Sequence, residues 1–190
     1  GPETGAALVA LADLSTGQDL PVTPDIVTAL QAVVQETAGQ PDVAAARRSL
    51  IWAEAAAGDF PAAFADLPGD PEAGVRLWRL LALIGPDEAV LDFAVLAPGA
   101  PLPQSDAETK IAFAQRLQDI GLPDAALRWA EAITPADPLL LARIHLIRHD
   151  GRAALAVLET ASGPDAYVLR AEALLQLGDP AAAATVLAAA

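Results

Sequence analysis

A glycine recurs along this chain at intervals of about one helical hairpin, and a small residue follows it five positions later each time. Each glycine ends one apolar helical pattern, and the small residue lies early in the next. The five pairs are Gly58 and Ala63, Gly85 and Val90, Gly121 and Ala126, Gly151 and Ala156, and Gly178 and Ala183. The glycines recur roughly every 30 residues, the period range of stacked helical hairpins. The pattern predicts a helical repeat architecture and narrows the function to binding.

The composition also favours helices. Hydrophobic residues make up 54% of the 190 residues, but aromatic residues make up only 4%. Most of the apolar content is Ala and Leu, which are strong helix formers, whereas sheet proteins need more β-branched and aromatic residues. The predicted fold class is therefore all-α.

Gly, Pro and Asp divide the chain into a succession of predicted helices. Ser105 is predicted to cap one of them, with Glu108 completing a capping box. The predicted ranges are 24–38, 42–57, 60–67, 71–84, 87–97, 106–120, 123–133, 138–149, 152–161, 164–177 and 180–190. Most connections are short, which favours antiparallel neighbours.

The longest break lies at 98–103 and is the predicted joint between two halves. The predicted organisation is an N-terminal arm or linker over 1–22, a helical N-terminal half over 23–97 with irregular repeats, and a more regular C-terminal half over 104–190. The arm begins Gly1-Pro2, which is typical of the scar left by a tag-removing protease. We therefore expect the sequence to be a piece of a longer protein.

Two stretches of the second half carry a family pattern of glycine, small residue and proline. One is Gly121, Ala126, Ala130, Ile133 and Pro138, and the other is Tyr167, Leu174, Gly178, Ala183 and Leu187. From about residue 44 onward the chain resembles the tetratricopeptide-repeat (TPR) family of α-solenoids. The resemblance implies a right-handed superhelix of about five antiparallel helix hairpins. A non-repetitive helical bundle is the alternative.

Charge and cysteine content exclude several function classes. The net charge is −14 and the pI is about 4.2, so general binding to nucleic acids or anionic membranes is not expected. The chain has no Cys, which excludes disulfides, thiolate metal sites and cysteine nucleophiles. The alanine- and arginine-rich, lysine-poor usage indicates a bacterial protein.

Catalytic motifs are also missing from the sequence. His145 and His149 are four residues apart on one predicted helix, a spacing that can bind zinc, but no Glu lies between them and a third ligand would have to come from Asp150 or another helix. A pair of polar surface residues is the simpler interpretation. There is no G-x-S-x-G elbow and no phosphate-binding glycine loop. We predict a protein that is not an enzyme and has neither a cofactor nor a metal.

The candidate partner-binding residues come from the family's geometry, in which the first helix of each hairpin lines the concave surface. Mapping by the turn glycines places on this face Arg48, Trp52, Arg79, Gln115, Gln118, His145, Arg148 and His149. We predict a groove that takes an acidic or C-terminal peptide segment through Arg. The alternative is that these Arg pair with Asp and Glu of neighbouring helices on a merely solvated face. Core packing is predicted for Trp78 and Trp129. For Trp52, both core packing and a place on the binding face are kept as interpretations.

The predicted function is a non-catalytic scaffold or adaptor of a bacterial multiprotein assembly, binding a peptide or protein. One alternative is a helical, substrate-holding arm of a larger cell-envelope enzyme, and another is a secretion or assembly chaperone. The envelope is favoured over the cytoplasm, with membrane attachment only through a removed anchor. The Ala-rich end at 181–190 leaves a homodimer as a further expectation.

Overall fold

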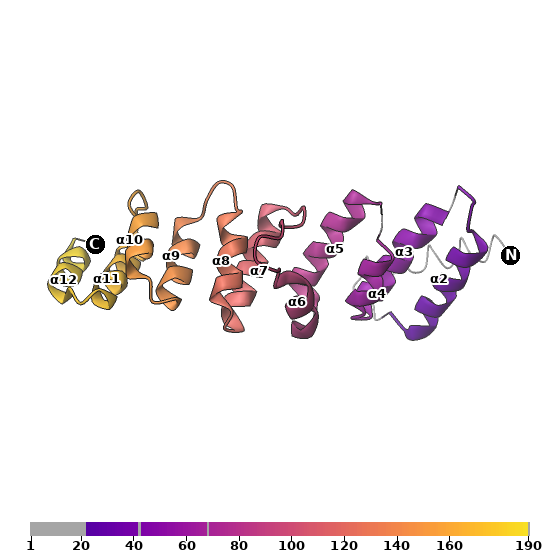
Figure 1. Cartoon of the computed structure of the whole chain (residues 1–190), viewed down its shortest axis with the longest axis horizontal. Coiled ribbons are helices and arrows are strands. Elements are labelled where there is room, and N and C mark those ends of the chain that lie inside the picture. The colour runs from indigo at the N-terminus through magenta and orange to yellow at the C-terminus, as the bar shows by residue number, and fades with distance from the viewer. Residues whose placement is uncertain (1–21, 42, 68, 190) are drawn as a thin grey trace. The chain divides into compact units, whose positions relative to one another are not determined.

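In the part of the chain that the structure describes, all regular secondary structure is helical. This computed structural model describes residues 22–41, 43–67 and 69–189, in which eleven helices and no strands are found. The helices are α2 (Pro24–Glu36), α3 (Val43–Ala56), α4 (Phe60–Ala65), α5 (Pro71–Ile84), α6 (Asp87–Ala94), α7 (Ala107–Asp119), α8 (Pro123–Glu131), α9 (Pro138–Ile147), α10 (Gly151–Val157), α11 (Pro164–Gln176) and α12 (Pro180–Ala188), as labelled in Figure 1. The predicted all-α class is confirmed for these residues. The predicted arm lies outside them except for Val22.

Aspartate side chains begin many of these helices. The carboxylates of Asp59, Asp70, Asp137, Asp150 and Asp179 each accept a hydrogen bond from a backbone N–H in the first turn of the helix that follows. Such caps satisfy N–H groups that have no partner inside the helix. One predicted cap is wrong: Ser105 Oγ donates to the carbonyl oxygen of Pro103 at 3.2 Å, and α7 begins two residues later.

One kind of turn closes four of the hairpins. A residue with positive φ follows the first helix, and the next residue donates its N–H to a carbonyl five positions back. This is the Schellman geometry, which usually places glycine at the left-handed position. The donor–acceptor pairs are Asp59 to Glu54 (2.9 Å), Leu122 to Leu117 (2.8 Å), Asp150 to His145 (2.8 Å) and Asp179 to Leu174 (2.9 Å). The left-handed residues are Gly58, Gly121, His149 and Gly178.

The structure corrects the fourth instance of the sequence pattern. The turn residue is His149, with φ of 58°, and the small residue five positions later is the fully buried Ala154. Ala156, predicted to lie at the helix contact, is exposed. Gly151 has a different role: a Cβ there would lie 2.8 Å from the carbonyl oxygen of Ala173, so α10 begins too close to α11 to admit a side chain.

The chain divides into two compact units. Unit 1 contains the described residues up to Val95 together with Pro103–Asp106, and unit 2 contains Leu96–Leu102 and Ala107 onward. Arg128 on α8 ties the 96–102 segment into unit 2, since its guanidinium donates to the carbonyl oxygens of Leu96, Ala97 and Ala100 at 2.8, 2.9 and 2.6 Å.

In unit 1, α3 is the central helix and packs against α2, α4 and α5. Leu30, Leu50 and Ala53 form a buried cluster between α2 and α3. Val22, Ile26, Val27 and Val34 pack around this cluster. The amphipathic face of α2 thus covers one side of α3 and leaves the other to α4 and α5.

In unit 2, each helix packs against the next, and α11 also packs against α9. Small residues allow the helices to approach closely, as expected from the sequence. Fully or nearly fully buried side chains from α9 to α11 form one cluster of Ala142, Leu146, Ala154, Leu158, Ala166, Leu169 and Ala173. Trp129 is buried against Phe113, with ring centroids 4.5 Å apart, so its predicted core role is confirmed.

Candidate functional site

Arg48 is bound by a carboxylate of its own unit. Its Nε donates to Asp70 Oδ2, which joins α3 to the start of α5. The backbone N–H of Ala73 and the Arg48 guanidinium hold the pKa of Asp70 below its ordinary value, and the same carboxylate raises the pKa of Arg48. Both groups are therefore charged at neutral pH.

The other two predicted residues of unit 1 differ in exposure. Arg79 lies half exposed with its guanidinium 3.9 Å from a carboxylate oxygen of Asp106. Trp52 is buried, and the guanidinium of Arg76 lies 4.3 Å from the centroid of its ring. Trp52 therefore packs inside the unit rather than on an open face.

In unit 2, the predicted residues lie on α7 and around the end of α9. Arg148 Nε donates to Asp124 Oδ1 at 2.6 Å. Gln115 is exposed, and Gln118 is half-buried, with a buried Oε1 that has no hydrogen-bond partner among the described residues.

The two histidines do not share a helix face, contrary to the prediction. α9 ends at Ile147, and the left-handed conformation of His149 turns the chain away from the helix. His145 stays on the helix, half-buried, and its Nδ1 is buried without a hydrogen-bond partner in the described structure. Among the described residues no group of three or more His, Cys, Asp or Glu side chains could hold a metal ion.

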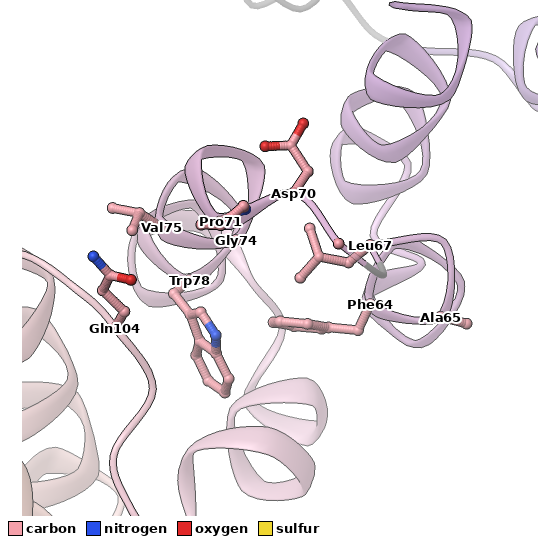
Figure 2. Close-up of a pocket in the computed structure, with 10 residues that line it drawn as sticks. Phe64, Ala65, Leu67, Asp70, Pro71, Gly74, Val75, Trp78 and Gln104 are labelled. Atoms are coloured by element: carbon pink, nitrogen blue, oxygen red, sulfur yellow. The ribbon is translucent and has the colours of Figure 1, made fainter. Parts of the chain in front are cut away.

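Unit 1 has an open, largely apolar cleft between α4 and α5, here called the aromatic cleft (Figure 2). It encloses about 530 Å³. Its lining residues are Phe64, Ala65, Leu67, Gly69, Asp70, Pro71, Gly74, Val75, Trp78 and Gln104. Small-molecule and side-chain sites typically have volumes of roughly 300–1,000 Å³, so the cleft can hold a large side chain.

Aromatic rings form one end of this cleft. Phe64 and Trp78 point toward one another in Figure 2, with ring centroids 4.8 Å apart, while the carboxylate of Asp70 points away from them. On α6, Phe93 stacks on Phe64 with ring centroids 4.4 Å apart and is not among the residues that line the cleft. Trp78 is only half-buried, so the core role predicted for it is fulfilled in part: one side packs and the other lines the cleft.

A second hollow, here called the polar cleft, is lined mainly by residues of α3 and of the start of α5. It encloses about 580 Å³ and shares Leu67, Gly69, Asp70 and Pro71 with the aromatic cleft. Its other lining residues are Ala44, Arg47, Arg48, Ile51, Asp66 and Glu72. Of the predicted site residues in unit 1, Arg48 lines this hollow, whereas Trp52 and Arg79 do not.

Sequence reasoning missed the aromatic cleft because aromatic residues in a helical apolar pattern are usually core. Gly74 was the available signal. It lies in the interior of α5, where glycine weakens a helix, and it marks the wall of the cleft.

A buried carboxyl group lies near the centre of unit 1. Glu54 on α3 is 1% exposed; its Oε1 accepts a hydrogen bond from Gln31 Nε2 at 3.4 Å, and its Oε2 has no partner among the described residues. Burial raises the pKa of Glu54 to about 7; the Gln31 hydrogen bond opposes the shift, and the nearby charges of Asp66 and Asp59 add to it. Glu54 is not among the residues that line either cleft, so its carboxyl group is a structural element of the helix packing.

No helix in the described ranges has both the length and the apolar character needed to cross a membrane. Comparison with protein-family models, with curated proteins and with solved structures finds no match to this chain.

Proposed function

We propose that the chain is a non-catalytic protein-interaction scaffold whose hairpins build a TPR-like right-handed superhelix and whose partner docks on unit 1. The aromatic cleft carries this proposal. Its rings pack against one another, and they are only partly buried. Aromatic side chains presented in this way dominate the binding energy of many protein interfaces.

The arginines predicted to bind a partner are weaker candidates for a docking site than the aromatic cleft. Arg48, Arg79 and Arg148 each have a carboxylate within ion-pair distance. An acidic peptide would have to displace these carboxylates, so much of its gain in binding would be offset by the loss of the existing pair. An apolar side chain in the aromatic cleft would gain contact with the rings without separating any of these three ion pairs.

Selection of binders from a random peptide library, with the whole chain as bait, tests this function. The affinities of the selected peptides are then compared for the wild type, Trp78→Ala, and the matched control Leu83→Ala, which removes an exposed apolar side chain of the same helix outside the cleft. We expect Trp78→Ala to weaken binding by roughly 2 kcal/mol and Leu83→Ala to leave it unchanged. Equal binding to all three proteins, or no selected peptide at all, would contradict the proposal.

The pair Arg79→Glu and Arg148→Glu examines the groove predicted from the sequence in the same assay. Loss of binding in these variants alone would move the docking site to the arginine-bearing helix faces. A crystal structure of the whole chain tests the superhelix, since a solenoid requires the same right-handed rotation from each hairpin to the next.

A further inference from the structure

We infer that the aromatic cleft takes an aromatic side chain from an extended, basic segment of a partner protein, and that Gly74 keeps the cleft open for it. This inference rests on the proposed scaffold function and names the chemistry of its ligand. Three features of unit 1 support it: the rings, the glycine and the charges at the rim.

The rings favour an aromatic guest. Phe64 and Trp78 are tilted by 55° to one another, and Phe64 is itself stacked on Phe93. A third ring entering between Leu67 and Trp78 could adopt the same tilted or offset geometries, which aromatic pairs prefer over direct face-to-face contact. An aliphatic guest would gain the burial of its surface without these contacts.

The packing around α5 does not require a glycine at position 74. A Cβ at this position would meet only Leu67 Cδ2, at 3.7 Å, which is ordinary van der Waals contact. Alanine would therefore fit and would strengthen α5, because glycine is the poorer residue in a helix interior. The glycine weakens its helix without relieving a clash, and the space it leaves is part of the cleft wall.

The charges favour a basic segment. Among the described residues that line the aromatic cleft there is no Lys or Arg. In the adjoining polar cleft, Asp70 neutralises Arg48, while Asp66 and Glu72 outnumber Arg47. The net charge of −14 attracts a cationic segment during encounter and repels an anionic one. At the opposite edge, the exposed amide of Gln104 offers a donor and an acceptor for the main chain of an extended segment.

The experiment is an NMR titration of the isotope-labelled whole chain with short unlabelled peptides. The three indole N–H signals separate the sites: Trp78 lines the cleft, Trp52 is buried beneath Arg76, and Trp129 is buried in unit 2. The probe is a heptapeptide with a central tryptophan between lysines. Its comparators carry alanine at the centre, or glutamates in place of the lysines.

We expect the lysine-flanked tryptophan peptide to shift the Trp78 signal and leave that of Trp129 in place. The alanine-centred peptide should bind roughly tenfold to a hundredfold more weakly, since it loses the burial of an aromatic side chain. The glutamate-flanked peptide should bind several-fold more weakly at low salt, and this difference should shrink at high salt because exposed charges are screened.

The Gly74→Ala variant separates a role in binding from a role in folding. We expect its unfolding midpoint to rise and its affinity for the tryptophan peptide to fall by roughly fivefold or more. Unchanged affinity in a stabilised Gly74→Ala protein would overturn the inference, as would an unmoved Trp78 signal. If library-selected peptides still bound in either case, the scaffold function would stand and only the assignment of this ligand would fail.

Discussion

At the scale of single residues, Glu54 is a buried side chain whose protonation state affects stability. Its carboxyl group is buried, with one oxygen unpaired, and its pKa is raised from 4.5 to about 7. The folded state therefore holds the proton more tightly than the unfolded chain does. The stabilisation from this proton is fully present below about pH 4.5 and is lost as the pH rises toward about 7.

Glu54→Gln should accordingly change stability in a pH-dependent way. We expect the free energy of unfolding of the variant to match that of the wild type near pH 4 and to exceed it by about 3 kcal/mol near pH 8. Urea denaturation at the two pH values measures the difference. Glu172→Gln, an exposed change on α11, is the control and should alter neither value by more than about 0.5 kcal/mol. An equal effect of Glu54→Gln at both pH values would contradict the assignment.

His149 is a second residue with a measurable energetic consequence. It has a φ of 58° at a position where the three related turns use glycine. A non-glycine residue in this conformation brings Cβ close to the following carbonyl oxygen. We expect His149→Gly to stabilise the protein by about 0.5–1 kcal/mol in thermal or urea unfolding, and Gly178→Ala to destabilise it by a similar amount. If both variants were stabilised or both destabilised, the left-handed conformation would not be the cause of the stability change.

At the scale of helices, the approach of α10 to α11 is closer than a side chain permits. We expect Gly151→Ala to destabilise unit 2 by about 1–3 kcal/mol, because its Cβ would meet the backbone oxygen of Ala173 and the side chain of Leu177. Faster amide exchange in α9–α11 would locate the effect. Gly74→Ala, the same substitution on α5, should have the opposite sign, and destabilisation by both would contradict this account.

The helices themselves could be predicted from the sequence to within a few residues, because their ends carry local chemistry. Asp70-Pro71 opens α5 and Gly178-Asp179 separates α11 from α12, and each of these signals acts through the backbone beside it. The turn at His149 was missed because histidine carries no such signal and Gly151, two residues on, does.

The candidate site could not be predicted in the same way. Whether Trp78 packs on all sides or lines a cleft depends on α4 and on Gln104, which are distant in sequence. The pairing of Arg48 with Asp70 likewise joins residues 22 positions apart. A sequence pattern places residues on a helix face but does not show what the neighbouring helix presents to it.

At the scale of the whole molecule, we expect repulsion among its own charges to outweigh the exposed ion pairs. The chain carries 25 acidic and 11 basic residues, and several of the ion pairs are largely exposed and therefore weak. Raising sodium chloride from about 0.02 M to about 0.5 M should screen this repulsion and raise the unfolding midpoint by about 2–4 °C at pH 7. Circular dichroism measures the midpoint; a fall with salt would mean that the ion pairs outweigh the net charge.

The repeated turn also determines where the sequence can accept an inserted or deleted residue. Each of the four turns is closed by a hydrogen bond between residues five apart, so one inserted residue would break this bond and change how the following helix leaves the turn. The link over 132–137, between α8 and α9, has no bond of this kind in the described structure. Single insertions and deletions should therefore be tolerated in such links, whereas the turns can be gained or lost only together with an entire hairpin.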